Sequence, residues 1–445
     1  MLPLLVLASA VFGAEALGQS TEPAPVVKVI RFGKLVDGTG AVLTNAAVVV
    51  EGDRIKSVGP WSSTSVPGAE VIDLSRYTGI PGLIDVHTHL AGFAGDPGGP
   101  THGLAQAPNQ ALLRPPVIDM FLAREAPQRM LEAGVTSVRD VGTYQMMDIA
   151  MRDLINRGTI PGPRMFVSGP IVRSSSALGV AVPEATADGP AEMTRVVRRL
   201  IAAGADHIKI MGTTAAGPSA PGATRTVAVY TGTYAMFTDD ELRTAVEVAH
   251  GLGKRVAVHT IGQAGARSAV RAGANSIEHG IGLDDSTMAE MAKRGTILVP
   301  TLYNGVYTAE RVRPQERAWF ENLAAQHVET VRRAVKAGVT IAMGSDVCCI
   351  TWMSGEHTRE LAWFVKAGMT PAQALATATT NAAALLGKEK ELGSVAPGYF
   401  ADLVAVDGNP LADIDVVVSK VRWVMKGGAI VVDRTLPGRA VELRR

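Results

Sequence analysis

A helix that ends in glycine and runs at once into a short β-rich stretch recurs through this 445-residue chain. Glycine suits the left-handed residue that closes a helix, so each repeat indicates a helix followed by a strand. The closing glycines are Gly134, Gly204, Gly273, Gly295 and Gly338. With the runs LIDVH, RMFVS and RVAVH, the chain offers eight strands separated by segments long enough for helices. Eight such units predict an α/β fold, the (β/α)8 TIM-like barrel.

Two β-rich ends flank the predicted barrel. Residues 26–80 contain VVKVIRF, AAVVVEGDRIKSVG and EVIDLS, and residues 389–440 contain DLVAVDG, VVVSKVRWVMKGG and IVVDR, with turn signals between the runs. We expect the two halves to pair into a small β-sandwich beside a barrel that occupies residues 81–388. A helix from Thr370 to Gly387 is expected to join the barrel to the second half.

The charge balance and composition limit the partners. The chain carries 43 Lys and Arg against 42 Asp and Glu, a net charge of +1, which argues against nucleic acid as the main partner. With 47% hydrophobic and 19% charged residues the composition is that of a globular protein. Cys348 and Cys349 are adjacent, and neighbours seldom reach disulfide geometry, so both are expected to be packing residues. A homo-oligomer is the expected assembly.

The N-terminal stretch is similar to an export signal. An apolar run from Leu2 to Phe12 precedes the small residues around Ala16, so residues 1–18 are predicted to be a signal peptide and the protein to be periplasmic or secreted. The first positive side chain is Lys28, and a signal too weak to function would leave the protein cytoplasmic. No later segment reaches 18 uninterrupted apolar residues, so no membrane span is expected.

Four histidines and one aspartate fall at the predicted strand ends. His87 and His89 end the first strand, and residues i and i+2 on a strand face the same side, so both point into the barrel mouth. The fifth and sixth strands end in His259 and His279, and the eighth runs into Asp346. Barrels of this kind place catalytic groups at the carboxyl ends of their strands. This set of donors suits zinc or a similar divalent ion.

Lys209 lies at the same height on the fourth strand. An ammonium group would repel a metal ion, but burial shifts a lysine toward the neutral amine, and that amine can react with carbon dioxide. The resulting carbamate is an anionic ligand with two oxygens. N6-carboxylated Lys209 would therefore be able to bridge two divalent ions, with zinc as the expected metal.

Several motifs together resemble the metal-dependent amidohydrolase superfamily. They are PGLIDVHTH, the strand-four lysine, VAVHT, SIEHG, GSDV and the tail NAAALLG…LGSVAPGYFADLVAVDGNPL. The most similar branch contains Xaa-Pro dipeptidases, carboxypeptidase-like amidases and ochratoxin-degrading amidohydrolases, and the resemblance covers about residues 26–435. It implies a first metal held by His87, His89 and Asp346, a second held by His259 and His279, and a carboxylated Lys209 between them.

The resemblance implies hydrolysis of a peptide-like amide bond. Two divalent ions lower the pKa of water and polarise a carbonyl, and Asp346 would take a proton from the attacking water and deliver it to the leaving amine. Two alternatives remain open. One is a mononuclear cyclic-amide hydrolase or deaminase of the same superfamily, which would not need Lys209. The other is a non-catalytic structural relative, which would be free to lose metal ligands.

Members of this branch release an amino acid with a free α-carboxylate, and such a group needs a cation or hydroxyl donors near the metals. We expect small amide substrates, either N-acyl amino acids or dipeptides, with ochratoxin-type compounds among them. The candidate substrate-binding residues are Arg225, Tyr230 and Tyr234 in the loop after the fourth strand, and Arg139 at the end of the second. Arg139 could instead pair within the protein, and the tyrosines could simply pack the loop.

Other polar residues are weaker candidates for a role at the metal site. Asp85, two residues before His87, could orient a ligand histidine or bond to the backbone at the strand end. His207 is expected to pack inside the barrel or to support a ligand. His250 and His327 fall on helices outside the barrel, and both are expected at the surface.

Overall fold

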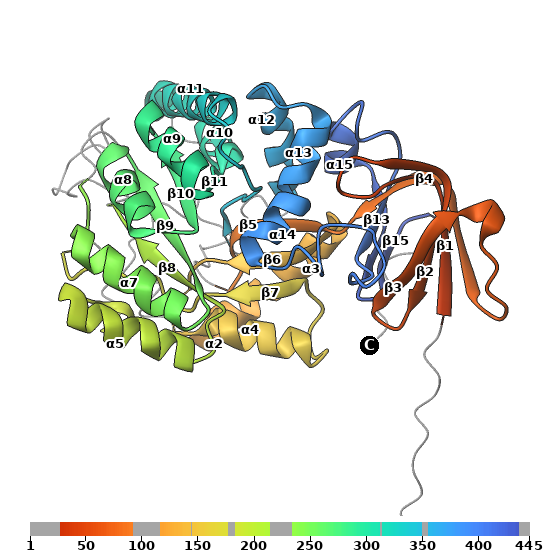
Figure 1. Cartoon of the computed structure of the whole chain (residues 1–445), viewed down its shortest axis with the longest axis horizontal. Coiled ribbons are helices and arrows are strands. Elements are labelled where there is room, and N and C mark those ends of the chain that lie inside the picture. Colours follow the sequence, from red (N-terminus) through yellow and green to blue (C-terminus); the bar gives the residue numbers. More distant parts are fainter. Residues whose placement is uncertain are drawn as a thin grey trace, which may run out of the picture.

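The computed structural model describes residues 27–91, 116–143, 145–176, 183–213, 234–311, 314–348 and 355–435. An α/β body lies beside a smaller β-rich lobe (Figure 1). The predicted signal peptide, residues 1–18, lies outside the described ranges. Within those ranges no helix has both the length and the apolar character needed to cross a membrane.

Seven strands of the body lie where the sequence predicts them. They are β5 (Leu83–His89), β6 (Val135–Asp140), β7 (Arg164–Val167), β8 (His207–Met211), β9 (Arg255–Ile261), β10 (Ser276–Ile281) and β11 (Ile297–Val299). The eighth differs from the prediction. Residues 340–346 lie between β11 and β5 and make two backbone hydrogen bonds to each, and only the short β12 (Val347–Cys348) pairs regularly. Asp346 has a φ of 57°, which interrupts the extended backbone just before β12.

The wall of the body consists of two four-stranded parallel sheets, β12-β5-β6-β7 and β11-β10-β9-β8. We call them the two arcs. Isolated parallel bridges join their edges, from Val172 to Ile210 of β8 at one seam and from Leu298 of β11 to Ile341 at the other. The regular ladder is therefore two arcs linked by short bridges, where the sequence predicts one continuous barrel.

Helices lie on the outside of the arcs (Figure 1). They are α2 (Pro116–Ala123), α3 (Ala126–Glu132), α4 (Met147–Asn156), α5 (Gly189–Ala202), α7 (Asp239–Gly251), α8 (Gln263–Ala272), α9 (Asp285–Arg294), α10 (Leu302–Arg311), α11 (Pro314–Lys336) and α12 (Glu360–Lys366). Short 3-10 turns cover Trp61–Ser63, Pro183–Ala185 and His357–Arg359. The five predicted closing glycines all have positive φ, between 73° and 107°, which confirms the repeated change from helix to strand.

The predicted helix from Thr370 to Gly387 is two helices. Thr370 caps α13 (Pro371–Thr377) through a reciprocal capping box with Gln373, and Gly387 closes α14 (Thr380–Leu386) in the left-handed conformation. Between them Thr379 has φ −130° and ψ −97°, which breaks the helical backbone. The start and the end of the predicted segment are confirmed, but its continuity is not.

The β-rich lobe is one seven-stranded sheet in the order β15-β14-β13-β4-β1-β2-β3. Its strands are β1 (Val27–Val36), β2 (Val42–Glu51), β3 (Arg54–Pro60), β4 (Glu70–Pro81), β13 (Leu403–Val406), β14 (Val421–Lys426) and β15 (Ala429–Asp433), and α15 (Asp415–Ser419) precedes β14. The two chain ends pair as predicted, and their strands form one continuous hydrogen-bonded ladder. The long strand β4 allows this, because it pairs in parallel with β1 and, through its carboxyl end, antiparallel with β13.

One buried cluster of the lobe draws on both chain ends, with Phe32 of β1 and Trp423 of β14 among its fully buried members. A polar contact ties this lobe to the arcs. Arg164 of β7 donates to Asp402 at 2.6 Å, and its guanidinium stacks on Phe400. The lobe is therefore anchored to the base of the body by a partly buried ion pair.

We predict that Trp423→Ala lowers the free energy of unfolding by about 3–5 kcal/mol, the usual result of truncating a fully buried aromatic side chain. Trp423 is 1% exposed, whereas Ile430 of the neighbouring β15 is 40% exposed. Ile430→Ala is the matched control and should change stability by less than about 1 kcal/mol. Chemical denaturation followed by far-UV circular dichroism measures both. Equal losses in the two variants would contradict a shared core between the chain ends.

Candidate metal centre

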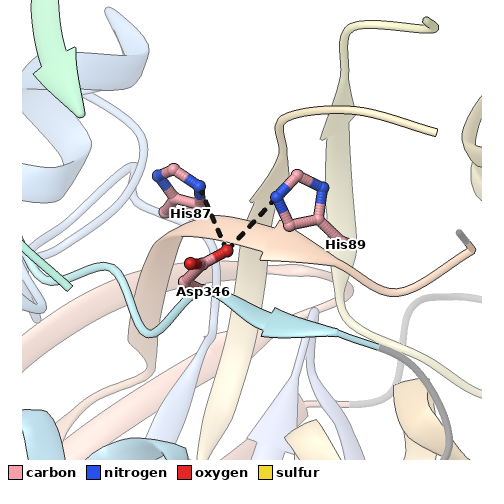
Figure 2. A group of neighbouring side chains, drawn as sticks. All are labelled: His87, His89 and Asp346. Carbon is pink, nitrogen blue, oxygen red and sulfur yellow. Dashed lines mark ion pairs between the residues drawn. The ribbon is translucent and has the colours of Figure 1, made fainter. Parts of the chain in front are cut away.

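Two histidines and an aspartate meet at the carboxyl end of β5. His87 and His89 are two residues apart on this strand, so both side chains face the interior. Asp346 Oδ1 lies 3.5 Å from His87 Nε2 and 3.3 Å from His89 Nε2, and Figure 2 shows the three side chains pointing toward one another. Their ligand atoms lie within 4.8 Å of one another. The three residues could therefore share one metal ion.

The Nδ1 atoms of both histidines already have partners in the protein. His89 Nδ1 donates to the backbone carbonyl of Gly142 at 2.8 Å, and His87 Nδ1 lies 2.7 Å from Glu278 Oε2. A carbonyl or an ionised carboxylate only accepts hydrogen bonds, so each Nδ1 carries the proton. Each Nε2 then offers its lone pair toward Asp346, which is the tautomer that binds a metal through Nε2.

His259 of β9 and His279 of β10 form the second half of the centre. Their ring centroids are 4.6 Å apart, and His279 lies 4.9 Å from His87. His279 Nδ1 is 2.8 Å from Thr301 Oγ1. Burial, together with the charge of Lys209, lowers the pKa of His259 to about 3. The His259 ring is therefore neutral at ordinary pH and has a lone pair to offer.

Lys209 occupies the inner face of β8, where its side chain is 2% exposed. Burial lowers the pKa of its amine to about 8, with Glu278 opposing that shift and Arg139 adding to it. The amine is therefore neutral in a larger fraction of molecules than an exposed lysine would be. A neutral amine is the form that reacts with carbon dioxide, so the environment of Lys209 fits the predicted carbamate.

The residues present fit a group of bound cations. Within the part of the chain that the structure describes, His87 Nε2 and His259 Nε2 are buried and have no hydrogen-bond partner. A buried polar atom left unpaired costs about 1–3 kcal/mol, and a metal ion at each would satisfy them. Neutral imidazoles with a carboxylate are a donor set that zinc accepts. The structure thus brings all six predicted ligands to one end of the arcs.

Three residues of the centre have strained backbones. Asp346, His279 and Thr301 have φ values of 57°, 65° and 55°, and such conformations cost on the order of 1 kcal/mol each. Hydrogen bonds hold Asp346 in place, because its backbone N–H donates to the carbonyl of His87 at 2.8 Å and Asn304 Nδ2 donates to Oδ2 at 2.7 Å. Asp346 Oδ1 is therefore left facing the histidines.

Asp85 fixes the backbone of this region. Its fully buried carboxylate accepts the backbone N–H groups of His87 and Ser345, both at 3.1 Å, and the Ser345 hydroxyl at 2.5 Å. Of the two roles left open by the sequence, the structure shows the bond to the backbone. Gly344 is required beside it, since a Cβ there would lie 2.5 Å from the Cβ of His87 and 2.4 Å from Val299.

Arg139 corrects a prediction. Its side chain is 3% exposed and lies inside the arcs. Its guanidinium donates to the carbonyl of Val86, to Ser276 Oγ and to Glu278 Oε1, at 2.6, 3.0 and 2.7 Å. The predicted contact with a substrate carboxylate is therefore replaced by an internal role, because a buried carboxylate on the opposite arc takes the charge.

The remaining candidates are the predicted substrate-binding residues of the loop after β8 and the histidines not predicted as ligands. Arg225 and Tyr230 lie outside the described residues, and Tyr234 is 73% exposed. His327 was expected at the surface, but it is buried, and its Nε2 donates to the carbonyl of His279 at 2.9 Å. The prediction failed because α11 packs against β10 and turns this face inward. His250 is at the surface as predicted, and His207 is buried inside the arcs.

Sequence reasoning missed three residues beside the centre. Glu278 and Asn304 contact the ligands His87 and Asp346 directly. Arg173 follows Val172, whose N–H donates to the carbonyl of Lys209, and its positive charge contributes to the lowered pKa values of Lys209 and His259. Of the three, only Glu278 could have been found from the sequence, because it is an acidic residue directly before the predicted ligand His279 in SIEHG.

Comparisons with known proteins agree with this arrangement. The profile of the Amidohydrolase family matches residues 78–431. Ochratoxinase of Aspergillus niger is 31% identical over 453 aligned residues, which cover 92% of this chain and 88% of that protein. An imidazolonepropionase of Geobacillus thermodenitrificans is 28% identical, with 88% of this chain and 91% of that protein covered.

Solved structures are similar over the whole described fold. A Xaa-Pro dipeptidase with methionine bound in its active site superimposes with a TM-score of 0.79 at 31% identity, covering 91% of this chain and 99% of that one. The crystal structure of A. niger ochratoxinase gives a TM-score of 0.77 at 28% identity, covering 93% and 97%. Because the family profile and a relative above 30% identity both span most of the sequence, the chain belongs to the amidohydrolase family and is a hydrolase of its metal-dependent branch, the one that includes ochratoxinase and Xaa-Pro dipeptidase.

Proposed function

We propose that this protein is a binuclear amidohydrolase that releases a free C-terminal amino acid from N-acyl amino acids or dipeptides. The observation that carries the proposal is the contact between two groups of ligand residues in a centre that also contains a buried lysine, Lys209. His87, His89 and Asp346 form one group, and His259 and His279 form the other, with ring contacts linking the two. An anionic bridge at Lys209 would explain why a buried lysine lies close enough to His87 and His259 for its charge to lower their pKa values.

The proposed hydrolysis needs two bound metal ions and a residue that transfers a proton. Two bound divalent ions would lower the pKa of water and polarise the substrate carbonyl. Asp346 would accept a proton from the attacking water and return it to the leaving amine as the amide bond breaks. Burial alone would raise the pKa of Asp346, but its contact with His89 and the positive charge of Lys209 hold that pKa below its ordinary value. Asp346 is therefore ionised and ready to accept that proton.

The relatives support a substrate with a free carboxylate. One dipeptidase structure holds methionine, and a prolidase with a TM-score of 0.79 and 28% identity holds n-methylphosphonate-l-proline. Both molecules carry an amino-acid carboxylate. In this chain Arg173 is the described arginine whose charge acts on both Lys209 and His259. We propose that its guanidinium recognises the substrate carboxylate, in place of the buried Arg139.

A mononuclear enzyme of the same family is the second candidate. Among the described residues, His87, His89 and Asp346 form the one group of three His, Cys, Asp or Glu residues whose ligand atoms lie within 4.8 Å of one another. One metal ion held there would suffice for a cyclic-amide hydrolase or a deaminase. Metal analysis separates the two candidates. About two equivalents of zinc per chain support the binuclear enzyme, and one equivalent supports the mononuclear one.

We predict that Lys209→Ala loses the second metal equivalent and lowers turnover by more than about 100-fold, beyond the effect expected of an outer-shell residue. Acetate or propionate should restore part of both, by supplying the missing carboxylate. Lys426→Ala is the matched control, because the pKa of Lys426 is also lowered to about 8 by burial and its amine donates to the carbonyl of Gly162, away from the centre. A Lys209→Ala protein that keeps two metals and near-normal turnover without additives would refute the carbamate.

We predict that a panel of amides will show turnover of N-acyl-phenylalanines or Xaa-Pro dipeptides, with chromatography detecting the released amino acid. The same substrates with an amidated carboxylate should react much more slowly, because they lack the anion that the Arg173 guanidinium would recognise. Hydantoins and lactones serve as cyclic comparisons. Turnover of the cyclic compounds alone, or equal turnover of acids and amides, would contradict the proposed substrate class.

We predict that Arg173→Met raises KM for the carboxylate substrates by about 10–100-fold, the range for losing a hydrogen bond to a charged group. The KM for the amidated substrates should change little, since they lack the charge. Arg294→Met, which alters an exposed arginine paired with Glu290 on α9, is the control. Steady-state kinetics on both substrate series distinguishes recognition of the carboxylate from a general loss of activity.

A further inference from the structure

We propose that Glu278, held by Arg139, is a positioning residue that fixes the tautomer and orientation of His87 and so assembles the first metal site. The inference rests on the proposed two-metal function, because it assigns His87 to a metal. Neither Glu278 nor Arg139 would contact the substrate. Both residues would act through the position of the His87 ring.

The contacts of Glu278 leave little freedom for its carboxylate. Glu278 is fully buried. Its Oε1 accepts from Arg139 Nη2 at 2.7 Å and from Ser276 Oγ at 2.5 Å, while Oε2 faces His87 Nδ1 at 2.7 Å. Donors on three strands therefore converge on one carboxylate, and the oxygen turned toward His87 is held in place by the bonds to the other oxygen.

The charge of Glu278 determines which nitrogen of His87 carries the proton. The guanidinium of Arg139 pairs with Glu278 Oε1 at 2.7 Å, and the Ser276 hydroxyl donates to the same oxygen, so the carboxylate is held as the anion. The resulting anion can only accept, so His87 Nδ1 must donate. His87 Nε2 is then unprotonated and lies 3.5 Å from Asp346 Oδ1. Without the anion, either tautomer of the ring would be available, and one of them cannot bind a metal through Nε2.

Arg139 adds control of position. Besides Glu278, its guanidinium holds Ser276 Oγ and the carbonyl of Val86, the residue before His87. The arginine therefore links β5 and β6 on one arc with β10 on the other. The backbone that carries His87 and the carboxylate that bonds to its ring are fixed to the same guanidinium.

An irregularity in β10 allows two consecutive residues of this strand to face the metal centre. Successive residues of a strand normally face opposite sides, yet Glu278 contacts His87 while the next residue, His279, lies beside the rings of His87 and His259. The φ of 65° at His279 and a register shift between His279 and Ile281 break the alternation. Glu278 can therefore support the first metal site, while His279 is available to the second.

The test is the metal content of the purified holoenzyme, measured by elemental analysis after dialysis against a chelator. Wild type should keep about two zinc ions per chain. Glu278→Gln should keep about one, with affinity at the weakened site lower by about 10–100-fold. Arg139→Gln should keep most of its metal, because the carboxylate still faces His87. Asp148→Asn removes another fully buried carboxylate that accepts only backbone N–H groups, and it should keep two.

A second variant keeps the inference testable if the buried guanidinium left unpaired in Glu278→Gln prevents folding. The double variant Arg139→Gln with Glu278→Gln has no unpaired charge, and it should show the same loss of one metal. Unchanged zinc content and affinity in the folded Glu278 variants, or an equal loss in Asp148→Asn, would overturn the positioning role. A wild-type protein that itself holds fewer than two metals would instead count against the proposed function.

Discussion

The interior of this protein depends on neutralising charges that are buried together. Arg139, Glu278 and Lys209 lie almost fully buried between the two arcs, where charges interact more strongly than in water and where an unpaired one is unfavourable. The ion pair between Arg139 and Glu278 joins the arcs across the interior and satisfies Arg139. Removing one partner of such a pair typically costs about 3–5 kcal/mol. The remaining positive group, Lys209, is the one that the proposed chemistry turns into an anion.

The metal centre lies where the strand pairing of the wall is irregular, and the backbone of this segment explains why. Residues 340–346 make only two backbone hydrogen bonds to β11 and two to β5, and the left-handed turn at Asp346 directs its carboxylate toward His87 and His89. A regular strand there would give a better ladder but would turn the aspartate to another direction. Asp85 stabilises this local irregularity, because it bonds to the backbone N–H groups of His87 on β5 and of the neighbouring Ser345. Residues 340–346 therefore lack regular strand pairing at the point where the Asp346 carboxylate must face the two histidines.

The β-rich lobe has a different part in the structure. It contains both chain ends in one sheet, and β4 leads through Gly82 directly into β5, the strand that carries His87 and His89. The backbone N–H of Gly82 donates to Asp402, and Arg164 at the base of β7 bonds to the carboxylate of the same residue. The lobe therefore supports the start of the ligand-bearing strand, at the end opposite the metal centre.

The sequence by itself determined which residues could be ligands. Strand periodicity and closing glycines are local properties, so they predicted seven of the strands and placed His87, His89, Lys209, His259 and His279 at comparable heights. Charge partners and backbone irregularities are not local. The pairing of Arg139 with Glu278 joins residues 139 positions apart, and the burial of His327 depends on how α11 packs. Likewise the positive φ of His279 and Asp346 follows from contacts made only after the arcs meet. Only the tertiary structure decided these features, because each is maintained by partners that no repeat or spacing along the chain identifies.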